Sequence, residues 1–288
     1  MIPPRIYKPR KNELIYHYCS ADTFNAICSQ KTIRLCDIFS MNDFLEMHWG
    51  YSIWERVANE LITEIGYEFI DSIDKIIHYS GMNCLVLASC FSLDGDVLSQ
   101  WRAYADDGQG YVIGFEAKQL LKLNVKPLKI QYTEKKQLQE IKAFVLALFE
   151  VENRLEESEK FGSNFIDTCS IFSFDLASYK NPAFIEEKEV RLVHLLNFKE
   201  SNNFLKLADP GGTYFGNLVT GQKVNFMMYN NAPKTFLDIN FTNNNSINPI
   251  KEVIIGPKNN VLNTAISVYL ETLGIANVTI KKSKASYR

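Results

Sequence analysis

Residues 84–91 read Cys-Leu-Val-Leu-Ala-Ser-Cys-Phe, a nearly continuous apolar run. Such a run, without polar alternation, is typical of a strand that is buried on both faces, so we expect a buried strand here. Shorter apolar or alternating runs predict further strands at residues 13–18, 32–36, 110–116 and 189–196. The sequence therefore predicts a fold that is built around a sheet.

Between these strands, apolar residues recur at the spacing that is typical of helices. Apolar residues recur at alternating steps of three and four from 44 to 65, which predicts a long amphipathic helix. Two more helices are predicted within residues 134–177, and we interpret them as a helical hairpin inserted between sheet strands. Residues 252–281 read as a strand-helix-strand unit. Because no linker or internal repeat interrupts the chain, residues 1–288 are expected to form a single α+β domain.

The composition of the 288 residues argues against several classes of protein. The chain is 46% hydrophobic and 22% charged, with a formal net charge of −2. Its Lys and Arg residues are scattered, so no basic field favours nucleic acid as a partner. Without a signal-like start or about 18 consecutive apolar residues, we expect a cytoplasmic protein with no membrane partner. Six cysteines without a CxxC pair and four widely spaced histidines do not predict a metal site.

The first candidate for a functional site is the strand that carries His17. The sequence Tyr16-His17-Tyr18-Cys19-Ser20 places this histidine on a strand, with a hydroxyl three residues later at a helix start. Such an edge could hydrogen-bond a polar ligand. The alternative is a half-buried histidine bonded to the backbone, with Ser20 acting only as an N-cap, and the segment alone favours this alternative.

The second candidate is the exit of the strand at residues 84–91. Phe91 and Ser92 lie there, and Trp101 and Tyr104 follow on a predicted helix. Strand exits are common positions for ligands. Because Trp101 and Tyr104 are three residues apart on that helix, they are equally well explained as core anchors.

The third candidate is the segment in which charged residues enter a core strand. Residues 186–191 read Glu-Glu-Lys-Glu-Val-Arg, and Glu189 and Arg191 share one strand face. On an exposed face the two would be an ordinary surface ion pair. In a cleft, Glu189 would be a carboxylate held by a cation, suited to stabilising a developing positive charge. The spacing slightly favours the surface interpretation, and Glu186 and Glu187 are expected at the surface.

Taken together, the three segments resemble an uncharacterised bacterial family, domain of unknown function 2971, over most of the chain. The resemblance rests on the order and spacing of several short segments, and no single segment is sufficient for it. The matching pieces are Tyr16-His17-Tyr18, Phe39-Ser40-Met41-Asn42-Asp43 with Glu46, Cys90-Phe91-Ser92 with Trp101, Tyr104 and Ala105-Asp106, Gly114-Phe115, residues 186–191, and Ile255-Gly256-Pro257.

That family is in turn remotely similar to the ADP-ribosyltransferases, which bind NAD on a small split sheet. The resemblance implies a split mixed β-sheet with a helical-hairpin insertion, and NAD as the substrate. It also implies that His17 bonds the adenosine-side ribose, that Phe91 or Tyr104 stacks on nicotinamide, and that Glu189 is the catalytic carboxylate. The same resemblance places Tyr18, Ser20, Ser92, Trp101 and Arg191 around the ligand.

The activity implied by the resemblance is transfer of ADP-ribose to a macromolecule, either protein or nucleic acid, or hydrolysis of NAD, in the role of a toxin or antiviral effector. Two other hypotheses are open. The chain could be a binding or sensor module that recognises a nucleotide or a partner protein without turnover. It could also be a hydrolase or nuclease that uses Asp43, Glu46, Glu187 and Glu189 with a divalent metal.

Overall fold

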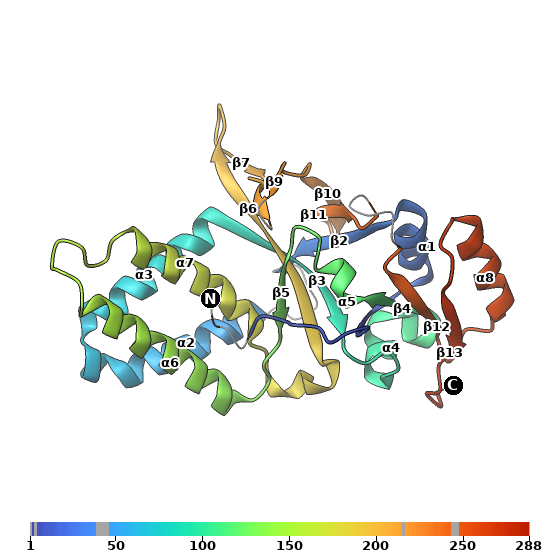
Figure 1. The fold of residues 1–288 in the computed structure, drawn as a ribbon, viewed down its shortest axis with the longest axis horizontal. Helices are drawn as coiled ribbons and strands as arrows, with labels where there is room; N and C mark the ends of the chain where they lie inside the picture. Colours follow the sequence, from blue (N-terminus) through green and yellow to red (C-terminus); the bar gives the residue numbers. More distant parts are fainter. Residues whose placement is uncertain (1, 3–4, 39–45, 215–216, 243–247, 288) are drawn as a thin grey trace.

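The computed structural model describes residues 2, 5–38, 46–214, 217–242 and 248–287, and the fold is a mixed sheet with several helices (Figure 1). The main sheet has the order β10-β11-β2-β3-β1-β4-β12-β13, and β6 joins it beside β3, with β5 and β7 beside β6. The β12–β13 pair is parallel and the other pairs are antiparallel. The sheet is therefore mixed, as expected.

The strands of this sheet are β1 (Leu14–Cys19), β2 (Thr32–Asp37), β3 (Cys84–Ser92), β4 (Tyr111–Glu116), β5 (Lys126–Lys129), β6 (Glu189–Glu200), β7 (Leu205–Ala208), β10 (Asn225–Tyr229), β11 (Ala232–Asn240), β12 (Ile250–Ile255) and β13 (Thr279–Lys282). A separate two-stranded sheet contains β8 (Gly212–Tyr214) and β9 (Asn217–Val219).

Strand β3 occupies the centre of the sheet and has different neighbours on its two sides. On one side it pairs with β6 along its whole length, from Cys84 to Ser92. On the other side it pairs with β2 at Leu87 and Ala88 and with β1 at Ser92. Strands β1 and β2 therefore diverge beside the short segment 89–91, and the sheet is split there.

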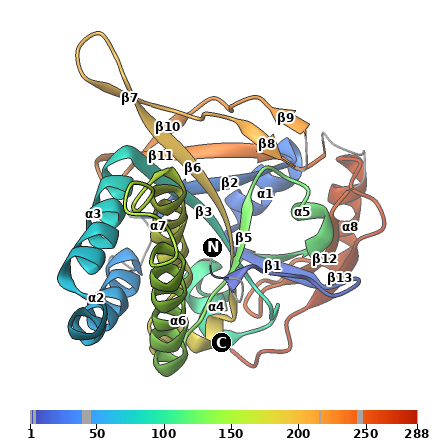
Figure 2. The same cartoon turned by 60° about the vertical axis from the view of Figure 1, so that its left-hand side comes forward.

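Four helices form a unit of their own at one end of the molecule (Figures 1 and 2). They are α2 (Glu46–Ile65), α3 (Tyr67–Asn83), α6 (Glu134–Glu152) and α7 (Ser163–Asp175). Their apolar faces, with Trp54, Leu61, Phe165 and Phe172, pack into one core separate from the core of the sheet. The predicted hairpin within 134–177 corresponds to α6 and α7, but α3 was not predicted.

The remaining helices cover the split sheet. Helix α1 (Ala21–Gln30) begins at Ser20, whose Oγ accepts a hydrogen bond from the Thr23 N–H, and ends at Lys31 in the left-handed conformation. With α5 (Ala117–Leu120) and α8 (Asn263–Thr272), α1 contributes apolar residues to the main core. Helix α4 (Leu98–Tyr104) packs Trp101 against Tyr18 in a smaller cluster.

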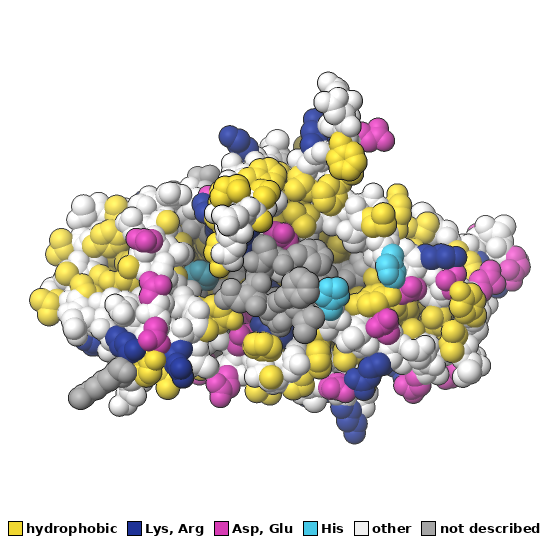
Figure 3. Space-filling view, turned by 180° about the vertical axis from the view of Figure 1, so that it is seen from behind, with side chains coloured by type: hydrophobic (Ala, Val, Ile, Leu, Met, Phe, Trp, Pro, Cys, Tyr) yellow, Lys and Arg dark blue, Asp and Glu magenta, His cyan; other side chains and the backbone are white. Residues whose placement is uncertain are grey.

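The surface of the molecule has no single dominant sign of charge on the face shown in Figure 3, where acidic and basic side chains are interspersed. This agrees with the formal net charge of −2. Among the helices of the described residues, none is both long and apolar enough to cross a lipid bilayer.

Candidate functional site

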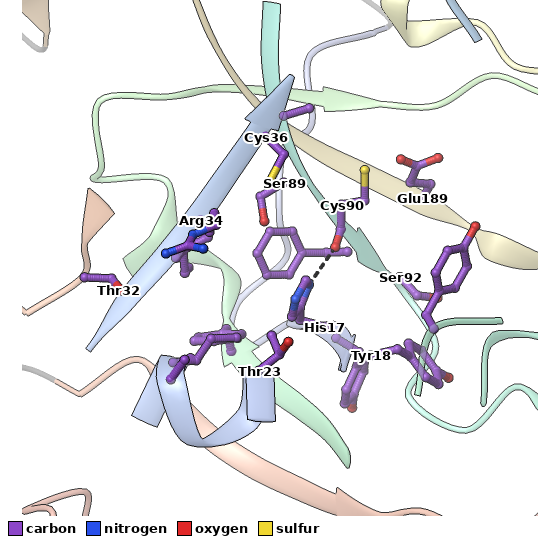
Figure 4. Close-up of a pocket in the computed structure, with 18 of the residues that line it drawn as sticks. His17, Tyr18, Thr23, Thr32, Arg34, Cys36, Ser89, Cys90, Ser92 and Glu189 are labelled. Atoms are coloured by element: carbon purple, nitrogen blue, oxygen red, sulfur yellow. Dashed lines mark hydrogen bonds between the residues drawn. The ribbon is translucent and has the colours of Figure 1, made fainter. Parts of the chain in front are cut away.

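A cavity of about 600 Å³ lies where the sheet is split. Residues of β1, α1 and β2 line it together with the segment 89–92 of β3, Tyr104 of α4, and the chain that leads into β6 (Figure 4). Such a volume is in the range of natural small-molecule sites. The three segments singled out in the sequence therefore meet at one cavity.

His17 enters the cavity from β1 and bridges the split in the sheet. Its Nδ1 lies 3.0 Å from the Cys90 carbonyl oxygen, and a carbonyl only accepts, so Nδ1 carries the proton. His17 is half-buried, and its ring centroid lies 5.4 Å from that of Phe91. Burial lowers the pKa of His17 below its usual 6.5. The neutral ring therefore has an unprotonated Nε2, which can accept a hydrogen bond from a ligand.

Glu189 begins β6 and lines the same cavity, but it is buried among charges. Its Oε1 accepts from Arg191 Nε at 2.6 Å, and its Oε2 accepts from Arg191 Nη2 at 3.0 Å and from Lys180 Nζ at 3.2 Å. Burial alone would raise the pKa of Glu189, but Arg191 and Lys180 outweigh it and lower the pKa to about 2. The carboxylate is therefore ionised and fixed in position.

The surface interpretation of this segment is wrong for Glu187, Glu189 and Arg191, all of which are buried. Glu187 Oε2 accepts from Lys180 Nζ at 2.6 Å, and Oε1 accepts from the Tyr104 hydroxyl at 3.0 Å. Burial raises the pKa of Glu187; Lys180 opposes that shift, and the charge of Glu189 supports it. Two carboxylates thus share one lysine at this end of the cavity.

Glu186 is exposed, as expected, and its Oε2 accepts from the Ser99 hydroxyl at 2.8 Å. After Glu186 the chain turns inward, and this turn has a local cause. Residues Pro182–Glu187 form a 3₁₀ helix that ends at Lys188, which has a left-handed φ of 45°. The alternation of side chains along β6 begins only at Glu189. It therefore did not predict that the Glu187 side chain points inward.

Phe91, Ser92 and Tyr104, which the resemblance implies lie at the ligand, also line the cavity. The Phe91 ring is buried and contacts Phe115, whereas the Tyr104 side chain remains more accessible. Ser92 Oγ accepts from the Asp94 N–H at 3.0 Å. Of the two aromatic rings proposed to stack on a ligand, Tyr104 has the larger accessible surface.

Four other predicted site residues form hydrogen bonds within the protein. Trp101 is buried away from the cavity, where Nε1 donates to Asp96 Oδ1 at 2.8 Å. Ser20 caps α1, and Arg191 lies behind Glu189, where Nη1 donates to the Ala177 carbonyl. Tyr18 does line the cavity, but its hydroxyl donates to the Asp94 carbonyl and accepts from the Val97 N–H. Ser20, Trp101 and Arg191 therefore support the site from outside the cavity.

The residues that line the cavity but that the sequence did not single out include Lys180 and Arg34. Lys180 lies beside a Pro-containing turn, where a lysine is usually solvated. Arg34 alternates with the buried Ile33 and Leu35 on β2, a pattern that equally describes a surface arginine. Only the three-dimensional contacts separate these side chains from ordinary surface residues.

No cluster of three or more His, Cys, Asp and Glu side chains suited to a metal ion occurs within the described residues. Asp43 and the side chain of Glu46, which the metal hypothesis requires, lie outside what the structure describes. Glu187 and Glu189 are close together, but the cation between them is Lys180.

Comparison with known protein families gives a match to part of the chain. Residues 100–192 match a family described as "Protein of unknown function (DUF2971)", which supports that part of the resemblance. The matched segment includes Tyr104, Lys180, Glu187 and Glu189, and it ends before most of β6. Neither the curated proteins nor the solved structures contain a match to the chain.

Proposed function

We propose that the protein consumes NAD, either by transferring ADP-ribose to a protein or nucleic acid or by transferring it to water. The observation that supports this proposal is the placement of His17 and Glu189 in one cavity (Figure 4). Phe91, Ser92 and Tyr104 line the same cavity. The cavity volume of about 600 Å³ also lies within the range of natural small-molecule sites.

The chemistry assigns a role to Glu189. Cleavage of the glycosidic bond to nicotinamide places positive charge on the ribose, and a fixed carboxylate stabilises such an oxocarbenium-like transition state. Glu189 has a pKa of about 2 and is therefore ionised at neutral pH. Its bonds to Arg191 and Lys180 hold the carboxylate before the substrate arrives.

The test measures release of nicotinamide and transfer of label from NAD that is labelled in its adenylate, with cell extract as the source of acceptors. Glu189→Gln is expected to reduce both signals by about a hundredfold or more, the usual effect of removing a transition-state contact. Glu186→Gln is the matched control, since Glu186 is an exposed neighbour on the same segment. Absence of nicotinamide release and transfer in the wild type would reject the proposal.

A second candidate function is a sensor that binds a nucleotide without turnover. The observation that favours it is the pairing of both Glu189 oxygens with Arg191 and Lys180, which reduces the negative charge that the carboxylate presents to a substrate. Calorimetry that detects NAD binding, together with an absence of nicotinamide release, would favour this function over the first.

A further inference from the structure

The end of the cavity opposite Glu189 is formed by β2 and its neighbours. In Figure 4, Arg34 and Thr32 lie on one side of His17, and Glu189 lies on the other. Asp238, directly opposite Arg34 in the β2–β11 register, lines this end as well. A ligand that extends from Glu189 past His17 would therefore meet Arg34.

The guanidinium of Arg34 is held flat in one orientation. Its Nε and Nη2 donate to the two oxygens of Asp238, each at 2.8 Å, and Nη1 lies 3.7 Å from Met227 Sδ. One face of the guanidinium covers the Phe236 ring, with 3.8 Å between Cζ and the ring centroid. The Arg34 side chain lines the cavity and is still 41% exposed, and we infer that its other flat face is the part that meets the cavity.

This geometry distinguishes between two kinds of ligand group. A phosphate would compete with Asp238 for the hydrogen-bonding edge of the guanidinium, because the bidentate pair already uses two of its nitrogens. A flat heteroaromatic ring requires only the open face, and nucleobases stack on arginine in this way. The contacts of Arg34 therefore favour a nucleobase over a phosphate as the ligand group that meets this side chain.

We propose that Arg34 forms a stacking subsite for a purine base, which would extend the Phe236–Arg34 stack by one ring. The identification of the base as the adenine of NAD rests on the proposed function; the subsite itself rests on the contacts of Arg34. Gln30 and Thr32 line the same end of the cavity and offer hydrogen-bonding groups to the edge of the base.

The test separates the two ends of the ligand by using AMP, ribose 5-phosphate and nicotinamide mononucleotide as probes in NMR titrations. The wild type is expected to bind AMP about tenfold more tightly than ribose 5-phosphate, since one base stack has that order of effect. Arg34→Lys keeps the charge but removes the flat face, so it should lose this preference and leave binding of nicotinamide mononucleotide unchanged. Arg56→Lys, in the exposed pair with Glu134, is the matched control and should change neither.

Equal affinity of the wild type for AMP and ribose 5-phosphate would overturn the subsite, and this comparison requires no variant to fold. Retention of the AMP preference by a folded Arg34→Lys protein would overturn it as well. The two proposals fail separately. If AMP is preferred in an Arg34-dependent way but NAD is not turned over, the subsite is retained and the proposed NAD-consuming activity is rejected. If NAD is turned over but AMP is not preferred, the activity is retained and the subsite is rejected.

Discussion

At the scale of single residues, Lys180 determines how two carboxylates can occupy one buried site. Its Nζ donates to Glu187 at 2.6 Å and to Glu189 at 3.2 Å, and its side chain is itself buried. Removing one partner of such a cluster leaves a charge buried without compensation, which is costly in free energy. Lys180 and Arg191 together balance the two negative charges.

Lys180→Met is therefore expected to lower the free energy of unfolding by about 3–5 kcal/mol at pH 8. The loss should be smaller at pH 5, because the pKa of Glu187 is already raised and its protonation then removes the uncompensated charge. Urea unfolding at both pH values measures the difference. Lys188→Met is the control: its pair with Asp94 is solvent-exposed, and about 1 kcal/mol or less should be lost at either pH. Equal effects of the two variants would contradict this account.

His17 gives a second prediction at this scale. Its Nδ1 donates to the Cys90 carbonyl, so ¹H–¹⁵N NMR should show the neutral Nδ1–H tautomer at pH 6.5 and a pKa below the usual value. Because the folded-state pKa is lowered, the contribution of His17 to stability is present above pH 6.5 and is lost as the pH falls below it. An Nε2–H tautomer would show that the Cys90 bond is not formed, and a pKa above 6.5 would show that burial does not dominate the titration of His17.

At the scale of secondary-structure elements, the sequence predicted the positions of most strands. It did not predict which of their charged side chains are buried. Apolar runs located β3 and β12 because burial on both faces requires such runs. Strand β6 was located too, but its first charged residues were interpreted as surface ones, because alternation does not show that Ala177 and Lys180 cover that face. The left-handed Lys188 that turns Glu187 inward has no signal in the periodicity.

Helix α4 allows a buried aromatic residue to be compared directly with one that lines the cavity. Trp101 is fully buried and bonded to Asp96, so Trp101→Ala should lower the free energy of unfolding by about 3–5 kcal/mol. Tyr104→Phe removes a hydroxyl that faces Glu187 in the cavity, so it should change stability by only about 1 kcal/mol but weaken NAD binding. Thermal unfolding and calorimetry on both variants measure these effects. The opposite pattern would make Trp101 the ligand-contacting residue.

At the scale of the whole molecule, the Glu189 end of the candidate site is bonded through Arg191 to the chain that follows the four-helix unit. The core of the sheet and the core of the four-helix unit are separate clusters. Arg191 connects the two regions, because it bonds Glu189 on β6 and the Ala177 carbonyl just after α7. The resemblance alone led us to expect His17 and Glu189 at one site, since composition and periodicity describe one segment at a time.

The charged cluster around Arg191 predicts how the stability of the whole protein depends on pH. The pKa of Glu189 falls from its usual 4.5 to about 2 on folding, so its contribution is present above pH 4.5 and is lost as the pH falls toward 2. A shift of that size corresponds to stability on the order of 3 kcal/mol. Glu187, whose pKa is raised, acts in the opposite direction, but only above pH 4.5.

Urea unfolding of the wild type at several pH values between 4.5 and 2 should therefore show a loss of stability that is smaller in Glu189→Gln. The variant is expected to be less stable near neutral pH, because Arg191 and Lys180 lose their shared partner, and to lose less on acidification. Other ion-paired carboxylates titrate in the same range, so the decisive quantity is the difference between the two curves. Glu186→Gln, at an exposed position, should follow the wild type. Parallel curves for wild type and Glu189→Gln would mean that Glu189 is not held as an ion by Arg191 and Lys180.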